Sequence, residues 1–289
     1  FNRYANFQDA TFNRYANFQD ATFTNGADFL GATFNRYANF QDATFTNGAD
    51  FLGATFNRYA NFQDATFTNG ANFQDATFND ANFQDATFNR YAYFRGATFT
   101  DANFQGATFN DADFLGATFN DADFLGATFT NGANFQGATF TNGAVFLGAT
   151  FNRYANFQDA TFNRYANFRG ATFTDANFQD ATFTNGADFL GATFTNGANF
   201  QDATFTNGAV FLGATFTDAN FQDATFNRYA NFQGATFTDA NFQDATFTNG
   251  AVFLGATFND ANFQDATFND ANFLEGYSGC VLGHFREAI

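Results

Sequence analysis

Phenylalanine recurs every five or six residues from Phe1 to Phe273, and from Phe7 on each is preceded two positions earlier by alanine. On an α-helix, a five-residue step turns roughly 140° past a full turn, which would scatter the rings around the cylinder. On a continuous strand, an odd step would send successive rings to opposite faces. The spacing therefore excludes both elements. It indicates a chain that turns a corner after every unit, so that all the rings point to one axis.

Two kinds of unit alternate along the chain. One reads Ala-x-Phe followed by QD, QG, LG or RG and lasts five residues, whereas the other reads ATF followed by ND or TD (five residues) or by NRY or TNG (six). Ala-Thr-Phe predicts a minimal strand with its side chains inward, outward and inward, and the trailing residues have turn chemistry. Such self-similarity at a fixed period is typical of a solenoid.

The A(N/D)F pattern followed by two variable residues resembles the pentapeptide-repeat family, whose usual motif is A(D/N)LXX, with Phe where that family most often has Leu. The resemblance covers residues 1 to about 274. It implies an all-β fold, a right-handed quadrilateral parallel β-helix with four units per coil and about 13 coils for 52 units. The extra residue of the six-residue units departs from the family pattern and should bulge at a corner. The structural core is then expected at the Phe positions, among them Phe12, Phe34, Phe56, Phe23, Phe45 and Phe67.

The repeat ends at Phe273, and we expect one solenoid over residues 1–274. Residues 275–289 differ in composition and predict a C-terminal cap or the start of a following segment, because an uncovered last coil would expose Phe rings and unpaired strand edges. Cys280 and His284 lie there and could form a nucleophile and a base, but the sequence supplies no orienting partner and a cap accounts for both. The sequence predicts no enzyme, no cofactor and no metal site.

The net charge is −17, there is no Lys, and the acidic groups are almost all Asp at the corners. Nucleic acid and anionic membranes are poor partners for such a surface. No run of 18 apolar residues predicts a membrane span. Corner aspartates such as Asp9, Asp20, Asp42 and Asp64 could stack and collect divalent cations, although a solvated acidic face is the simpler interpretation.

Deviations from the repeat carry the most information about contacts. If two unit pairs make a coil, three valines that replace the outward Asn or Asp fall on one side: Val145, Val210 and Val252. Leucines at the following corner fall on the same side at Leu125, Leu147, Leu190, Leu212, Leu254 and Leu274, whereas Leu30, Leu52 and Leu115 fall on the opposite side. The pattern predicts an apolar stripe in the C-terminal half, a candidate interface. Copying of motifs with drift is the alternative explanation.

Two functions are consistent with these features. The first is a non-enzymatic structural or interaction rod, a surface or filament component that associates with itself or another protein through coil ends and the apolar stripe. An extracellular or cell-surface location is favoured for it. The alternative is a DNA mimic, because the resemblance brings in quinolone-resistance proteins, acidic dimeric rods that bind DNA gyrase in place of DNA. The charge density, about 1.3 per ~4.8 Å against about 2.8 for duplex DNA, argues against the mimic.

Overall fold

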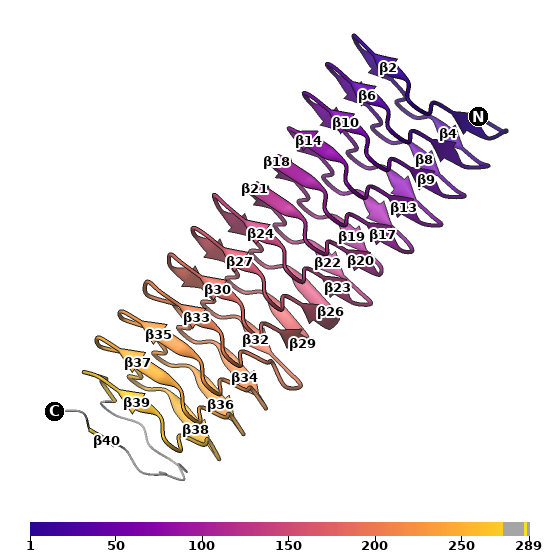
Figure 1. The fold of residues 1–289 in the computed structure, drawn as a ribbon. Coiled ribbons are helices and arrows are strands. Elements are labelled where there is room, and N and C mark those ends of the chain that lie inside the picture. Colours follow the sequence, from indigo (N-terminus) through magenta and orange to yellow (C-terminus); the bar gives the residue numbers. More distant parts are fainter. Residues whose placement is uncertain (274–285, 288–289) are drawn as a thin grey trace. The chain divides into compact units, whose positions relative to one another are not determined.

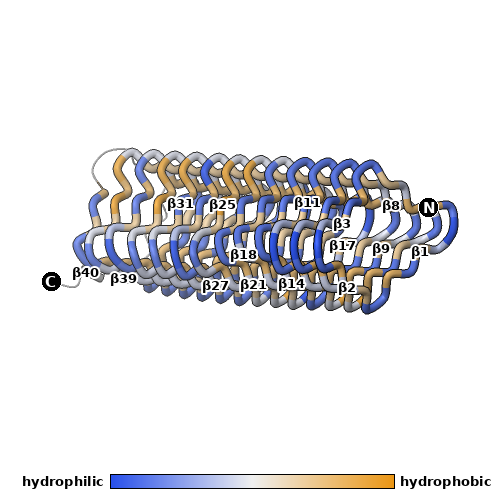
Figure 2. The backbone as a smooth tube through the Cα atoms, turned by 90° about the horizontal axis from the view of Figure 1, so that it is seen from above, coloured by the Kyte–Doolittle hydropathy of each residue, from blue (hydrophilic) through white to orange (hydrophobic). Residues whose placement is uncertain are grey.

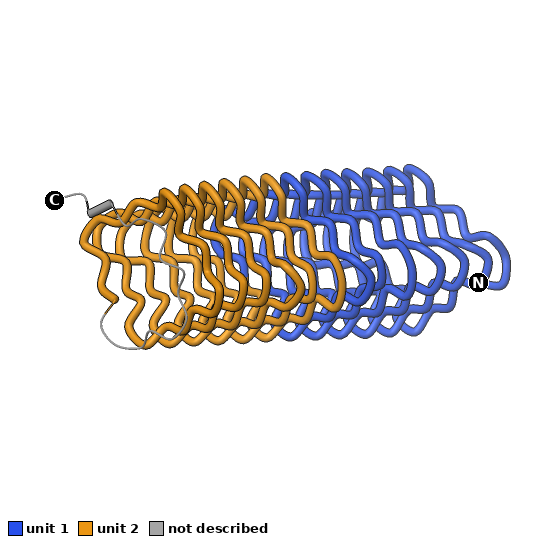
Figure 3. Tube along the Cα trace, turned by 90° about the horizontal axis from the view of Figure 1, so that it is seen from below, with its two compact units in different colours: residues 1–144 blue, residues 145–289 orange. Residues whose placement is uncertain are grey.

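The computed structural model describes residues 1–273 and 286–287, and all regular structure in that part of the chain is β-strand (Figure 1). The chain divides into two compact units, Phe1–Ala144 and Val145–Ile289 (Figure 3). Each unit is a stack of coils joined by parallel strand pairing, with about 13 coils over the two units, four of the 52 repeat units to a coil. The predicted parallel β-helix is confirmed. Among the described residues, no helix is long and apolar enough to cross a membrane.

In the first unit, strands of three sequence types form the coils. The Thr-Phe strands are β2 (Thr11–Phe12), β4 (Thr22–Phe23), β6 (Thr33–Phe34), β8 (Thr44–Phe45), β10 (Thr55–Phe56), β12 (Thr66–Phe67), β16 (Thr87–Phe88), β19 (Thr108–Phe109), β22 (Thr128–Phe129) and β24 (Thr139–Phe140). The strands that begin with Ala are β1 (Ala5–Asn6), β3 (Ala16–Asn17), β5 (Ala27–Asp28), β7 (Ala38–Asn39), β9 (Ala49–Asp50), β11 (Ala60–Asn61), β13 (Ala71–Asn72), β15 (Ala81–Asn82), β17 (Ala92–Tyr93), β20 (Ala112–Asp113), β23 (Ala133–Asn134) and β25 (Ala144–Val145). The longer strands are β14 (Thr77–Asn79), β18 (Thr98–Asn103) and β21 (Thr118–Asp123).

The second unit repeats the same types with more of the longer form. Its short strands are β27 (Thr161–Phe162), β28 (Ala166–Asn167), β30 (Thr182–Phe183), β31 (Ala187–Asp188), β32 (Thr193–Phe194), β33 (Thr204–Phe205) and β39 (Thr267–Phe268). Its longer strands are β26 (Thr150–Asn156), β29 (Thr172–Asn177), β34 (Thr215–Thr217), β35 (Thr225–Asn227), β36 (Thr236–Thr238), β37 (Thr246–Thr248) and β38 (Thr257–Asn259). β40 (Arg286–Glu287) pairs in parallel with β39. The rest of the predicted cap, with Cys280 and His284, lies outside the described residues.

Phenylalanine rings fill the interior as columns that run from coil to coil. Phe34 stacks on Phe12 and on Phe56 with ring centroids 4.7 Å apart in both cases, matching the strand register Thr33↔Thr55. Rings of neighbouring columns meet edge to face, as Phe29 and Phe40 do at 5.4 Å. Five of the six predicted core rings are at most 1% exposed, and Phe12, in the first coil, is partly buried: the five are Phe23, Phe34, Phe45, Phe56 and Phe67.

A tight turn follows each Ala-x-Phe unit. In one such turn the Ala32 N–H donates to the Phe29 carbonyl over 2.9 Å, and Gly31, at the third position, has φ of 63°. Asp42 takes the same place in another turn with φ of 56°. Positive φ at the third position is the signature of a type II turn, and Gly or Asp tolerates it best. Twenty of the 26 aspartates have positive φ. Most of the acidic charge therefore sits where the backbone requires a left-handed residue.

The other corner of each unit pair has five or six residues, and its length affects the register between neighbouring coils. Where it has five residues, two sides of a coil can merge into one strand, as in β18 and β21. Where it has six, the extra residue shifts the register: β26 runs through an NRY corner, and its pairing with β29 shifts between Phe151 and Tyr154. The predicted bulge is thus present at this corner.

Replacing one core ring tests the stacked columns. We expect Phe56→Ala to destabilise the chain by about 3–5 kcal/mol, because it opens a cavity between two stacked neighbours. Thr55→Ala, one residue earlier and facing outward, should cost less than about 1 kcal/mol. Denaturant unfolding followed by circular dichroism measures both. Equal effects of the two substitutions would contradict the assignment of the columns as the core.

Candidate functional site

The outward Asn or Asp of each Ala-x-Phe unit has a structural task that repeats along the faces. The Asn39 Oδ1 accepts the Gln41 N–H over 3.1 Å, which caps the following turn. The same oxygen accepts Asn61 Nδ2 from the next coil over 3.3 Å, so side-chain amides form a ladder parallel to the backbone ladder. Side chains of Asn and Asp make such local bonds to an N–H two residues on. A residue without an oxygen at this position gives up both bonds.

Three positions in one column of the second unit break this rule. Val210 and Val252 lie in one column with the outward residues of neighbouring coils. The column follows the bridges Asp188↔Val210, Val210↔Asn231 and Asn231↔Val252. Val145 joins the same column, because the Phe146 N–H donates to the Asn167 carbonyl and Asn167 pairs with Asp188. Valine has no side-chain oxygen, so the turn cap and the amide ladder are interrupted at all three positions.

Leucines occupy the adjoining corner, two residues after the column position. Leu147 and Leu254 are 38% and 36% exposed. Polar coils carrying Arg169 and Gln233 interrupt the set, so the predicted stripe is present but discontinuous. Leu125 lies in the first unit, at the turn after β21, where its N–H donates to Asp123 Oδ1 over 2.8 Å, and Leu274 lies outside the described residues. We call the following residues the Val/Leu row: Val145, Leu147, Leu190, Val210, Leu212, Val252 and Leu254. Figure 2 shows hydrophobic residues gathered near β31, in the middle of this row.

Tyrosines at the NRY corners extend along the face to the next coil. The Tyr165 hydroxyl donates to Asp188 Oδ2 over 2.8 Å, and the Tyr4 hydroxyl donates to Asp28 Oδ2 over 3.0 Å. Burial and then this hydrogen bond raise the pKa of Tyr165 to about 12, and the same causes raise the pKa of Tyr4. Tyr15 lies along the face in the same way, since its hydroxyl accepts Asn39 Nδ2 over 3.3 Å.

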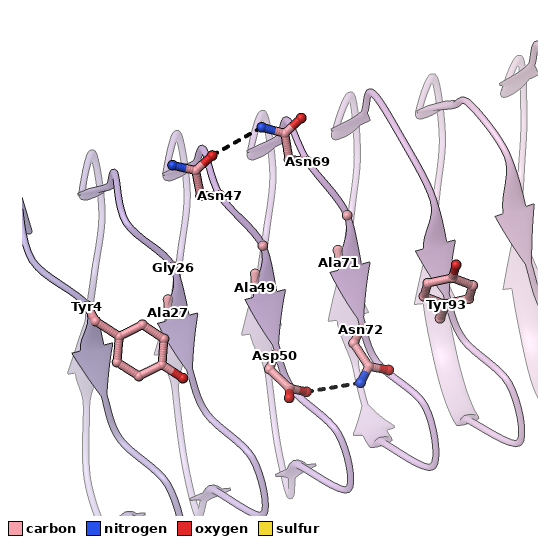
Figure 4. Close-up of a pocket in the computed structure, with 12 residues that line it drawn as sticks. Tyr4, Gly26, Ala27, Asn47, Ala49, Asp50, Asn69, Ala71, Asn72 and Tyr93 are labelled. Atoms are coloured by element: carbon pink, nitrogen blue, oxygen red, sulfur yellow. Dashed lines mark hydrogen bonds between the residues drawn. The ribbon is translucent and has the colours of Figure 1, made fainter.

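A groove of about 330 Å³ lies on the first unit where TNG corners replace NRY corners over three coils. Its floor is glycine and alanine, and the rings of Tyr4 and Tyr93 stand at its two ends (Figure 4). The amides of Asn47 and Asn69 follow one side and are joined by a 3.2 Å hydrogen bond. The other side carries Asp50 and Asn72, joined over 3.1 Å: Asn72 Nδ2 donates to Asp50 Oδ1.

The groove was not predicted from the sequence, although the signal is present there. The corner residues Tyr4, Gly26, Gly48, Gly70 and Tyr91 follow one another at the coil period, so three glycines stand between two tyrosines. Finding them requires the six-residue corners to be aligned coil by coil rather than read in chain order.

The corner aspartates form separate rows rather than one. Asp20, Asp42 and Asp64 follow one another through the bonds from the Asp20 N–H to Gln41 and from the Asp42 N–H to Gln63. Asp9 was grouped with them wrongly, because it lies half a coil away and stacks beside Gly31. Within residues 1–273 and 286–287, no three Asp, Glu, His or Cys side chains gather where they could hold one metal ion.

Comparison with known proteins identifies the repeat. A family model described as pentapeptide repeats matches the segments 7–55, 51–98, 83–128, 114–161, 124–172, 146–193, 189–236 and 232–275. A comparison with curated proteins gave no match.

Several solved structures are similar at low identity. HetL, a pentapeptide repeat protein involved in heterocyst differentiation regulation from the cyanobacterium Nostoc sp. strain PCC 7120, is 19% identical with a TM-score of 0.38, over 82% of this chain and 87% of that one. QnrB1, a plasmid-mediated fluoroquinolone resistance protein, is 13% identical with a TM-score of 0.26, over 92% and 91%. A pentapeptide repeat protein from the Arabidopsis thaliana thylakoid lumen is 24% identical with a TM-score of 0.19, over 34% and 57%. None of these similarities carries an argument about function.

The pKa of Tyr165 gives a testable pH dependence. An unfolded tyrosine ionises near pH 10, whereas Tyr165 in the fold ionises at about 12. Its contribution to stability is therefore complete below pH ~10 and is lost as the pH rises towards 12. An ultraviolet titration of tyrosinate should show an ionisation near pH 12 that Tyr165→Phe removes. If Tyr165→Phe instead lowered the amplitude of the tyrosinate signal near pH 10, the hydrogen bond to Asp188 would be contradicted.

Proposed function

The chain belongs to the pentapeptide-repeat family, and from this premise we propose that it is a non-enzymatic interaction scaffold that associates with further copies of itself. Each position of the repeat stacks on the same position of the next coil, so residues of one type form rows. The residues of a row follow one another at the strand spacing of ~4.8 Å. A second copy carries rows with the same spacing and therefore matches them over several coils. Association of this kind would make the chain a component of a surface layer or filament.

The Val/Leu row is the observation that supports the proposal most strongly. Each valine gives up a turn cap and an amide bond that neighbouring coils keep, at a cost of about 1 kcal/mol per hydrogen bond. A residue that departs from the local preference of its repeat, at a cost in stability, indicates a requirement other than stability at that position. Val145, Val210 and Val252 recur in one column, and each is followed by a leucine at the adjoining corner. Burial of these side chains against another molecule supplies that requirement.

Restoring the repeat at the valines should change stability and association in opposite directions. The triple variant Val145→Asn, Val210→Asn, Val252→Asn regains the caps, so its melting temperature should be unchanged or higher. Its self-association constant should fall by about tenfold or more, because apolar area leaves the contact. Sedimentation velocity over a concentration series measures the second effect.

A matched pair of leucine variants controls for a general loss of apolar surface. The variant Leu147→Gln should weaken association, whereas Leu115→Gln, at an equally exposed leucine on the opposite side, should leave it unchanged. Equal behaviour of these two variants would contradict a role for the Val/Leu row.

The DNA-mimic alternative has weaker support. Beyond the family resemblance, the acidic charge is its argument, and most aspartates sit at turn positions that favour Asp for its tolerance of positive φ. The conformation of the turns thus accounts for these aspartates, and no role in imitating DNA is needed to explain their charge. We expect DNA gyrase to supercoil plasmid normally when the protein is added in excess. Inhibition of supercoiling, or protection of gyrase from a quinolone, would favour the mimic instead.

A further inference from the structure

We infer that the groove of the first unit receives an arginine-tyrosine ridge from the first unit of a second copy. The inference rests on the proposed self-association and names a second contact for it, in a different unit from the Val/Leu row. Its occupant is another copy of this chain because the same unit carries a ridge that matches the groove in length, spacing and charge.

The ridge stands on the sheet opposite the groove. NRY corners follow one another there over three successive coils, and their rings stack with centroids 4.9 Å apart for Tyr15–Tyr37 and 5.3 Å for Tyr37–Tyr59. The groove is made where three successive TNG corners occupy the corresponding corner of the other sheet, next to β5, β9 and β13. Ridge and groove thus have the same number of coils and the same repeat distance.

The ridge is cationic. Each of its three corners carries an exposed arginine next to the tyrosine, at Arg14, Arg36 and Arg58. Among the described residues none of these three arginines forms an ion pair; the ion pairs found are Arg95–Asp113 and Arg169–Asp188. The ridge therefore presents three charges at the coil spacing, with no acidic partner among the residues that the structure describes.

The groove is acidic along one side. Asp50 lines the groove there, and Asp28 holds the same position in the preceding coil, beside the groove, paired through β5 and β9. Both hydrogen bonds of Asp50 use Oδ1, from the Leu52 N–H over 3.0 Å and from Asn72 Nδ2 over 3.1 Å, and no described residue reaches its second oxygen. Asp28 accepts from the Tyr4 hydroxyl through Oδ2. Opposite charges on two such surfaces steer association and fix its register.

The chain makes one arginine–aspartate pair of the proposed kind within itself. Arg95 Nε donates to Asp113 Oδ2 over 2.5 Å, and its guanidinium lies 5.5 Å from the ring centroid of Tyr93. Asp113 is the outward residue of β20, the position that Asp50 holds in β9. An arginine from a second copy would find at Asp50 the same kind of acceptor, with a tyrosine ring at the end of the groove.

The glycines give the groove its depth. Gly48 and Gly70 have φ of 73° and 82°, and a Cβ added at either would lie 3.9 Å and 3.7 Å from the nearest backbone oxygen. A side chain at these positions would therefore fit its own chain and would fill the groove. Because ridge and groove are different surfaces, the contact is heterologous and leaves one free ridge and one free groove, so that it can repeat from copy to copy.

The test uses full-length chains that all carry Val145→Asn, Val210→Asn and Val252→Asn, so that the Val/Leu row does not contribute. The groove variant adds Gly48→Asn and Gly70→Asn, since Asn tolerates positive φ. The ridge variant adds Arg14→Glu, Arg36→Glu and Arg58→Glu. A control variant adds the same charge change at the NRY corners of the second unit, as Arg153→Glu, Arg164→Glu and Arg228→Glu. Thermal melts by circular dichroism establish that each variant is folded.

Sedimentation velocity at low salt then separates the outcomes. We expect the groove and ridge variants each to be monomeric alone and to form a one-to-one dimer when mixed, because each supplies the surface that the other lacks. The dimer should dissociate as NaCl rises from 50 to 500 mM, and the control should associate like the parent chain. Self-association of either variant at the parent level, or no dimer in the mixture, overturns the inference.

The same data distinguish failure of this contact from failure of the proposed function. If the wild-type chain associates through the Val/Leu row but the parent, with that row made polar, is monomeric, the ridge-groove contact is wrong and the proposed function stands. If wild type is monomeric at every concentration, both are wrong.

Discussion

Aromatic rings stacked at the spacing of adjacent parallel strands hold each coil on the next. Rings of one column lie almost parallel, as in Phe34–Phe56 at 4.7 Å and 1°, which is the offset-stacked arrangement that aromatic pairs favour. A ring on a ring at this distance requires the coils to be in register, so every other residue type also stacks on its counterpart. Rows of Thr, Asn, Asp, Tyr and Gly on the faces are consequences of that register.

The register also allows residues that the coil structure requires to be distinguished from residues that it does not require. Aspartates at positive φ and outward asparagines that cap turns are accounted for by the coil itself. Positions that depart from these tasks are few, and they gather in two places. The valines of the Val/Leu row give up a cap, and three glycine corners open a groove beside Asp50. Both features are surface properties, which fits a chain whose interior is uniform.

Much of the fold was predictable from the sequence, because the five- and six-residue spacing of Phe allows few architectures. The core rings and the column of Val145, Val210 and Val252 follow from counting units. The error at Asp9 and the omission of the groove have one cause, which is that residues were compared in chain order and not coil by coil. Grouping Asp9 with Asp20 ignored the half-coil between them, and the groove appears only when corners such as Gly48 and Tyr4 are aligned coil by coil. The reach of a tyrosine to the next coil depends on side-chain conformation, which periodicity does not specify.

The central claim is that rows in register let copies of this chain associate side by side. Electron microscopy of the wild-type protein, in negative stain over a range of concentration at low salt, tests it most directly. The account predicts lateral assemblies that grow with concentration, with neighbouring copies aligned in parallel and offset by whole coils. Isolated single particles at every concentration would contradict it.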